Sequence, residues 1–481
     1  MASAKKGSSK AKSSFRVGRV RGDLRGRVWY LTYHEHGHRK RPRLGHDREA
    51  ARQMAAQINA QLETGVPAAL SFEPVKIADL QSRWLENHEQ VSRSSVQTIR
   101  RYRAATQHLL KYLEAGGAPQ STAHFRVEHA EQFVKHLRTI KVPPNGHPHA
   151  ACRPLLDKGV RFILETCRAM FNFAIRRRHL PPYSENPFGA LQLDRMPVEN
   201  AKGIVLFTPK EEQGFLEACD DWQFPVFLTL MLTGMRPGEL THLLLPEDLD
   251  WEAGVLSIRN RPQLGWQVKT RNERQIPLVS PLSDILRIVA GGRTSGPLFL
   301  RRRFQGGSLP PIDGANASRM EHEFRQRVTM AELDRGKSLS RLERSATCRQ
   351  VWRDAGAIKI ERLRIEFIRV CRRIGAEHLT APKMLRHLFA TGLQDANVDP
   401  LIRNELMGHV PAAHAGGSSL GMTASYTHTR PETRRRQLQV ALQNRPATAM
   451  ANRWLERQSQ RKCSGIVPEA GTIGTQGTPV G

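Results

Sequence analysis

A helical hydrophobic period that persists from residue 76 to residue 186 constrains this fold more than any other feature of the sequence. Apolar side chains recur there at spacings of three and four, as at Leu80 and Trp84. Glycine and proline interrupt the pattern only between helices, and a proline-rich run at 181–187 ends it. The pattern predicts a compact, all-helical domain over residues 75–190.

The sequence before this domain has a different character. Residues 1–14 read as a disordered basic tail. Three short segments that mix basic and apolar residues follow, and Asp47 can then cap a helix. They predict a small basic sheet packed on one helix over residues 15–65, with strands at Arg16 to Val20, Arg27 to Tyr33 and Lys40 to Leu44.

A third domain is predicted over residues 205–445. Thr208 and Glu211 form a capping box around Pro209, so a helix should begin there. We expect a buried helix over 224–233, three strands over 255–259, 267–270 and 275–278, and helices over 358–374, 381–396 and 400–407. Residues 301–354 are basic and carry few apolar side chains, so they read as a solvated insertion, with a dedicated DNA contact as the alternative. Residues 446–481 read as a second disordered tail. The fold class is therefore multidomain and mainly α-helical, with small β-sheets.

Charge indicates the partner. Lys and Arg total 74 against 45 Asp and Glu, a net charge of +29 that a nucleic acid would explain, although charge alone does not choose between DNA and RNA. Residues 1–50 hold 14 Lys and Arg against 4 Asp and Glu, and Trp29, Tyr30 and Tyr33 could form a sheet core there. This module is expected to enter a DNA groove or to act as a nonspecific tether.

Other compositional features exclude several classes. The six cysteines include no CxxC pair, which argues against a disulfide framework and a zinc ribbon. No stretch is apolar enough to span a bilayer, so we expect no membrane partner and a cytoplasmic, nucleoid-associated protein. His409, His414 and His428 lack acidic or cysteine partners at ligand spacing, so no metal or other cofactor is expected.

Five short motifs carry the chemistry. Arg236 lies in the turn Thr233-Gly234-Met235-Arg236-Pro237-Gly238-Glu239, where it could hold a phosphate or simply pair with Glu239. Lys269 stands beside a predicted hairpin turn. Lys383 and Arg386 share one helix face, His409 follows Gly408 at the end of a helix, and Tyr426 lies seventeen positions later.

Taken in this order, these residues resemble the signature of the tyrosine recombinase, or phage integrase, family: an arginine turn, a hairpin lysine, HxxR, LGH and a tyrosine followed closely by histidine. The resemblance extends over residues 207–443. It implies a C-terminal α+β catalytic domain. It also implies a helical core-binding (SAM-like) domain over 75–190 and an arm-binding-like sheet domain over 15–65.

The resemblance also implies roles. Arg236, Arg386 and His409 would bind the scissile phosphate, Lys269 would protonate the leaving 5′ oxygen, and Tyr426 would be the nucleophile. The expected partners are double-stranded DNA, three further copies of the chain in a homotetramer on DNA, and accessory DNA-bending or directionality proteins. No cofactor is implied, because fixed cations can stabilise the phosphorane charge and the phosphotyrosine conserves the ester bond.

Two departures keep an alternative open. Lys383 stands where the family has histidine, and His387 points to a different helix face. The interval from His409 to Tyr426 is also long, with small-residue pairs typical of an inserted loop. The alternative is a catalytically impaired DNA-binding protein on the same fold. A metal-dependent nuclease would need a carboxylate cluster that the spacing does not offer, and no aromatic sheet motif supports RNA binding.

Overall fold

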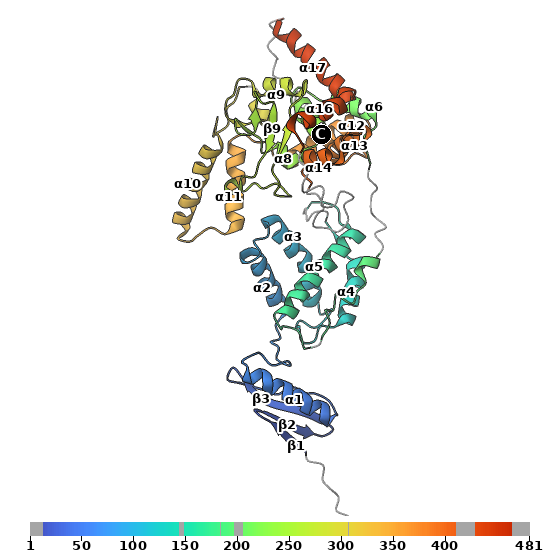
Figure 1. Ribbon diagram of the computed structural model, residues 1–481, viewed down its shortest axis with the longest axis vertical. Helices are drawn as coiled ribbons and strands as arrows, with labels where there is room; N and C mark the ends of the chain where they lie inside the picture. Colours follow the sequence, from blue (N-terminus) through green and yellow to red (C-terminus); the bar gives the residue numbers. More distant parts are fainter. Residues whose placement is uncertain are drawn as a thin grey trace, which may run out of the picture. The chain divides into compact units, whose positions relative to one another are not determined.

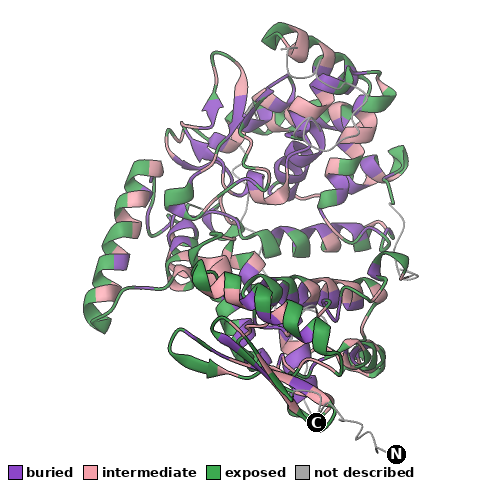
Figure 2. Cartoon of the chain, turned by 60° about the horizontal axis from the view of Figure 1, so that its bottom comes forward, coloured by how far each residue is buried: buried purple, intermediate pink, exposed green. Residues whose placement is uncertain are grey.

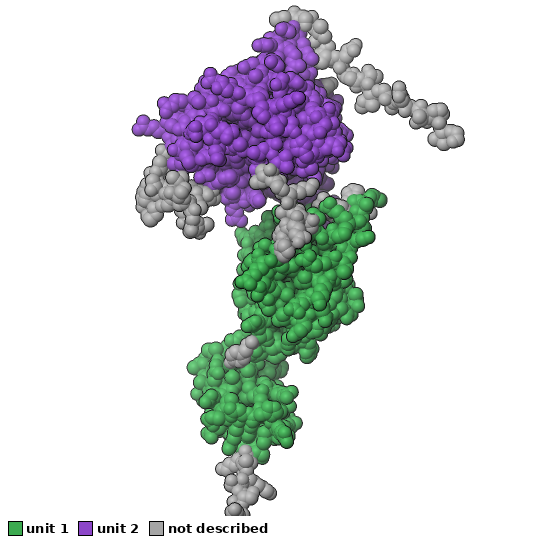
Figure 3. Space-filling view, turned by 90° about the vertical axis from the view of Figure 1, so that its right-hand side faces the viewer, with its two compact units in different colours: residues 1–202 green, residues 203–481 purple. Residues whose placement is uncertain are grey.

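The computed structural model describes residues 13–143, 149–182, 184–196, 205–305, 307–409 and 429–463. The chain divides into two compact units, residues 1–202 and 203–481 (Figure 3). It is mainly helical with small sheets, as the sequence predicts. The finer division of the first unit into two DNA-binding domains remains a prediction.

The N-terminal module is a four-stranded antiparallel sheet covered on one face by a helix (Figure 1). Its elements are β1 (Ser14–Val17), β2 (Val20–Arg25), β3 (Val28–Glu35), β4 (His38–Lys40) and α1 (Arg48–Glu63). Asp47 caps α1 as predicted, accepting a hydrogen bond from the Glu49 amide at 2.8 Å. The predicted strand at Arg16 to Val20 is wrong, because Gly18 adopts φ +53° and turns the chain between β1 and β2.

The two faces of this sheet differ. Leu31 and Tyr33 are buried in a small core with Ala55 and Ile58 of α1. Tyr30 points to the other face, contrary to the expected core role, and the Arg41 guanidinium lies 5.6 Å from its ring centroid. Arg16, Arg21 and Arg39 are exposed on strand positions, so the module presents basic side chains.

The remainder of the first unit is a helical bundle with a phenylalanine-rich core. Its helices are α2 (Ile77–Gln90), α3 (Val96–Glu114), α4 (Val127–Thr139) and α5 (Asp157–Arg176), with short elements β5 (Lys141–Val142), β6 (Arg153–Pro154) and η2 (Leu193–Arg195). Phe125, Phe171 and Phe188 pack ring against ring at centroid distances of 5.2–5.7 Å. The helical character predicted for this part of the chain is thus confirmed.

The second unit surrounds one wholly buried helix, α7 (Gln223–Thr233), and Figure 2 shows how burial is distributed over the chain. The unit also contains α6 (Pro209–Glu217), α8 (Pro237–Leu240), β7 (Leu244–Leu245), β8 (Leu249–Asp250), β9 (Val255–Ile258), η3 (Pro262–Leu264), β10 (Arg274–Pro277), α9 (Leu282–Ala290), β11 (Gly296–Pro297), η4 (Arg302–Phe304), α10 (Ala317–Arg335), α11 (Arg341–Asp354), α12 (Ile360–Arg373), α13 (Lys383–Asp395), α14 (Pro400–Met407), α16 (Pro431–Gln443) and α17 (Pro446–Cys463). The capping box at Thr208 and Glu211 forms as predicted. β10 pairs with β9, and β9 pairs with β8.

The insertion and the predicted C-terminal tail both contain helices. The insertion 301–354 contains α10 and α11, which pack on each other and project from the unit (Figure 1). Met320, Val351 and Trp352 are buried at its base, so it is more than a solvated loop. The tail predicted from Pro446 is helical as far as Cys463, and Trp454 of α17 stacks on Phe224 with centroids 5.6 Å apart.

Cys152, Cys167, Cys219, Cys348 and Cys371 are free thiols. Within the described ranges, the helices are either too short or too polar to cross a membrane.

Candidate phosphate-binding site

The turn between α7 and α8 positions Arg236. Gly234 ends α7 with φ +60°, and a Cβ there would lie 2.2 Å from the Phe389 ring, so only glycine fits. Arg236 caps α8: its backbone amide donates to Glu239 Oε2 and its Nη1 donates to Glu239 Oε1, both at 2.8 Å. The Arg236–Glu239 pair that the sequence left open is therefore present. Arg236 nevertheless keeps 23% of its side chain exposed, so it can also reach a ligand.

A second arginine shares this carboxylate. Arg274, in β10, donates from Nη2 to Glu239 Oε2 at 2.6 Å and from Nη1 to Oε1 at 3.2 Å. Burial alone would raise the pKa of Glu239, but the hydrogen bonds and charges of Arg274 and Arg236 hold this pKa below its ordinary value. Glu239 is therefore an ionised carboxylate fixed between two guanidinium groups.

Arg386 joins the Arg236 turn to the end of α14. Its Nη1 donates to the Gly234 carbonyl at 2.6 Å, and its Nη2 donates to the Met407 carbonyl. The same Nη2 lies 3.3 Å from Nε2 of His409, which must act as the acceptor because arginine only donates. Arg386 thus lies between the carbonyl ends of two helices, where their dipoles favour a cation.

The charges in this cluster are not balanced. Burial is the main cause that lowers the pKa of Arg386 to about 10, and the positive charges of Arg236 and Arg274 act in the same direction. The negative charge of Glu239 acts in the opposite direction. Burial and the charges of Arg386, Arg236 and Arg274 likewise lower the pKa of His409, which favours its neutral form at pH 7. Three arginines therefore lie near one carboxylate, and two of them, Arg236 and Arg274, bind it directly. The cluster carries an excess of positive charge that a phosphate would neutralise.

The end of α14 is held from several sides. Gly408 ends the helix with φ +63°, as the sequence predicts, and Asp399 caps its start. The carbonyls of Leu406, Met407 and Gly408 accept hydrogen bonds from Arg274, Arg386 and Thr270, respectively. These carbonyls have no partner within a helix, so the three side chains satisfy them and fix the chain that leads into His409.

Lys269 and Lys383 are both exposed. The predicted strand at 267–270 is wrong: Lys269 lies in a turn beyond the paired strands β9 and β10. Its neighbour Thr270 contacts Gly408 at 3.3 Å, which anchors the turn to the end of α14. Lys383 is the first residue of α13, one turn before Arg386.

Tyr426 and His428 lie outside the described residues. The structure describes the chain on both sides, at His409 and from Thr429 onward. The Thr429 hydroxyl lies 3.1 Å from Glu405 Oε1 of α14, and Arg434 of α16 lies 3.0 Å from Oε2 of the same side chain. The described chain therefore resumes at Thr429, three residues after Tyr426, and there it contacts α14, the helix that leads into His409.

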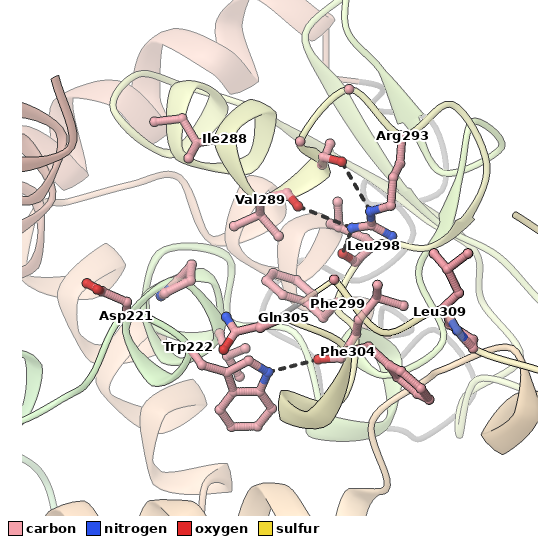
Figure 4. Close-up of a pocket in the computed structure, with 18 of the residues that line it drawn as sticks. Asp221, Trp222, Ile288, Val289, Arg293, Leu298, Phe299, Phe304, Gln305 and Leu309 are labelled. Carbon is pink, nitrogen blue, oxygen red and sulfur yellow. Dashed lines mark hydrogen bonds between the residues drawn. The ribbon is translucent and has the colours of Figure 1, made fainter. Parts of the chain in front are cut away.

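A separate hollow of about 920 Å³ in this unit shares no lining residue with the cluster. Its walls are largely apolar and include Trp222, Val289 and Phe299 (Figure 4). Arg293 also lines this hollow, and its guanidinium donates hydrogen bonds to backbone carbonyls such as that of Val289 (Figure 4). Among the residues that the structure describes, no group of three or more His, Cys, Asp or Glu side chains could hold a metal ion. The arginine cluster is therefore the candidate site.

Comparison with known proteins assigns the class of this unit. Residues 206–433 match the family model described as the phage integrase family, whose members are tyrosine recombinases. This region of the chain is therefore a domain of the phage integrase family. No curated protein matches the sequence.

Several solved structures are similar to this chain at low sequence identity. The Tn1549 transposon integrase in complex with transposon right-end DNA is 18% identical, with a TM-score of 0.46 over 76% of this chain and 99% of that one. A lambda integrase dimer bound to a COC′ core site is 15% identical, with a TM-score of 0.45 over 84% of this chain and 95% of that one. A lambda integrase tetramer bound to a Holliday junction is 15% identical, with a TM-score of 0.45 over 83% and 99% of the two chains.

Proposed function

We propose that this protein is a site-specific DNA recombinase that cleaves and rejoins DNA through a 3′-phosphotyrosyl intermediate on Tyr426. The observation that carries the proposal is the cluster of Arg236, Arg386 and His409. Its excess positive charge makes it suitable for binding a phosphodiester. The family match over residues 206–433 supports it. Tyr426 is also the only tyrosine in that matched region.

The reaction assigns one task to each group. The Tyr426 hydroxyl oxygen attacks the scissile phosphorus and loses its proton, while the bond from phosphorus to the 5′ oxygen breaks. Arg236 and Arg386 stabilise the negative charge that grows on the nonbridging oxygens, and His409 contributes a further hydrogen bond. Lys269 supplies the proton that the leaving 5′ oxygen needs. A 5′ hydroxyl of another strand then attacks the phosphotyrosine and restores the backbone without ATP.

Lys383 places a positive charge one helical turn before Arg386, at the position where the family has histidine. Because it is exposed and lies one helical turn from Arg386, its flexible side chain can donate to a phosphate oxygen. An ammonium group only donates hydrogen bonds, which favours water or a phosphate oxygen as the acceptor of the tyrosine proton.

The first unit supplies DNA affinity in this proposal. The exposed arginines of the N-terminal sheet would hold DNA away from the crossover point, and the helical bundle would hold the core site. Exchange between two duplexes requires four cleavages, so the active species would be a homotetramer on DNA. Accessory DNA-bending or directionality proteins are further candidate partners.

The alternative function is DNA binding without turnover. Lys383 in place of histidine is the observation that favours it. Both functions would keep the basic cluster, so DNA affinity does not separate them, whereas formation of a covalent intermediate does.

The test uses a nicked suicide substrate built from the DNA that flanks the protein's own gene. Cleavage next to the nick releases a short fragment, so the covalent intermediate accumulates. A recombinase gives a protein–DNA species that survives denaturing gels and carries the protein on a 3′ end. Binding without this species would support the alternative function instead.

A further inference from the structure

Arg274 occupies a position that the reaction described above leaves unexplained. Only 5% of its side chain is exposed, and its Nε and both terminal nitrogens donate to protein oxygens. Two of these nitrogens bind the two oxygens of Glu239, and Nε binds the Leu406 carbonyl at 2.8 Å. The guanidinium therefore joins the start of α8 to the end of α14.

On the α8 side, these contacts lead to Arg236. Glu239 Oε1 and Oε2 each accept one hydrogen bond from Arg236 and one from Arg274. Four hydrogen bonds fix the carboxylate, and the carboxylate fixes both the backbone and the guanidinium of Arg236. Removing Arg274 would leave Glu239 as a buried carboxylate with one cationic partner. Arg236 would then be drawn toward Glu239 and away from a ligand.

On the α14 side, the contacts lead to His409. The Nε bond to Leu406 lies one helical position before the Met407 carbonyl that Arg386 holds. Gly408 approaches the Arg274 side chain so closely that a Cβ there would lie 2.9 Å from Arg274 Cδ and Nη1. Arg274 also begins β10, the strand that follows the turn bearing Lys269. One buried side chain, on the strand that follows the Lys269 turn, is thus in contact with the elements that carry Arg236 and His409.

We propose that Arg274 is a positioning residue of the DNA cleavage reaction, which sets Arg236 through Glu239 and His409 through the end of α14. The inference rests on the proposed recombinase function and adds a residue to it. Arg274 is not a catalytic residue, because it is buried and its donors are engaged with protein oxygens. A lysine could not reproduce this role, because the planar fork of arginine binds both carboxylate oxygens and the carbonyl at once.

The test compares Arg274→Met and Arg274→Lys with Arg445→Met. Arg445 is a matched control because only 10% of its side chain is exposed, it donates to a buried carboxylate, Glu212, at 2.9 Å, and it donates to a backbone carbonyl, that of Met231, at 3.3 Å. Single-turnover cleavage of the suicide substrate is measured per folded protein, with the folded fraction taken from urea unfolding of each full-length variant. A second substrate carries an uncharged methylphosphonate at the scissile position.

The expected result depends on the charge of the substrate. Misplacement of Arg236 should slow cleavage of the phosphodiester by about 100-fold in both Arg274 variants. It should slow cleavage of the methylphosphonate by less than about tenfold, because that substrate has less negative charge to stabilise. Arg236→Met should show the same pattern. Arg445→Met should slow neither substrate by more than about threefold.

Four outcomes would overturn the inference, and the last of them also overturns the function on which it rests. Equal losses on the two substrates would reduce Arg274 to a structural role, as would Arg274→Met behaving like Arg445→Met. Full activity of Arg274→Lys would show that a bidentate arginine is not needed. A wild-type protein that forms no covalent species would instead overturn the recombinase function itself, and the inference with it.

Discussion

Replacing Gly408 with alanine should slow DNA cleavage per folded protein as well as destabilise the fold. Gly408 has φ +63°, and an added Cβ would lie 2.9 Å from both Cδ and Nη1 of Arg274. Gly336, which ends α10 with φ +61°, provides a matched control, because a Cβ there meets nothing within 4 Å. The two substitutions share the backbone penalty and differ only in the contact with Arg274.

The magnitudes follow from these geometries. A left-handed conformation costs a residue with a Cβ roughly 1–2 kcal/mol, and the lower conformational entropy of the unfolded chain with alanine offsets about 0.4–1 kcal/mol of this cost. Gly336→Ala should therefore lower the free energy of unfolding by about 1 kcal/mol. In Gly408→Ala, Arg274 must also move by roughly 0.5 Å or more to restore ordinary contact distances. Weakening a charge-assisted hydrogen bond adds about 1.5–3 kcal/mol.

The assay is urea unfolding of both variants together with single-turnover cleavage per folded protein. Displacement of Arg274 should slow cleavage in Gly408→Ala by about 10- to 100-fold. Gly336→Ala should cleave at the wild-type rate. Equal cleavage rates for the two variants, after correction for the folded fraction, would refute the reasoning that the end of α14 positions the site.

Three further predictions concern pH, metal ions and DNA affinity. Burial lowers the pKa of His242 to about 4, with a smaller contribution from the charge of Arg261, and a hydrogen bond to Gly238 acts in the opposite direction. As the pH falls, His242 is therefore protonated in the unfolded chain before it is protonated in the folded protein. The free energy of unfolding should fall by about 2 kcal/mol between pH 7 and pH 5. His242→Phe should remove that part of the decline in urea unfolding, and an unchanged decline would contradict the assignment. Cleavage should survive EDTA and need no nucleotide, since Arg, Lys and His stabilise the phosphate; loss on chelation with recovery in magnesium would favour a nuclease. Arg21→Gln combined with Arg39→Gln should weaken binding to a long attachment site and lower its salt slope by up to about 2, without affecting cleavage of a short core site; equal weakening on both DNAs would indicate a nonspecific tether.

The sequence was most informative where local chemistry decides the structure. Asp47, Thr208 and Asp399 cap helices as predicted, because a short polar side chain before an amphipathic stretch satisfies free backbone amides regardless of distant contacts. Gly234 and Gly408 end helices for a similar reason. These local signals placed Arg236 in a turn and His409 just beyond a helix.

Predictions failed where distant packing decides the structure. Residues 446–463 looked like a tail, yet Pro446 suits the first turn of a helix. Trp454 then packs on Phe224, which lies more than two hundred residues earlier in the chain. The turn at 267–270 looked like a strand, because alternation alone does not show whether a pairing partner exists. Arg274 was missed altogether, since a buried arginine in a short strand has the same local sequence as an exposed one. Its partners, Glu239 and Leu406, are distant in the chain.

Mapping of the covalent intermediate tests the central claim most directly. Protein trapped on the suicide substrate is digested with nuclease and protease, and the peptide that retains a nucleotide is identified by mass spectrometry, with Tyr426→Phe as the control. We predict that the nucleotide is on Tyr426 through a 3′ phosphate, and that the Phe variant binds DNA with nearly wild-type affinity but forms no adduct, because it loses one oxygen and no positive charge. An adduct on another residue, or one that persists in Tyr426→Phe, would contradict the account.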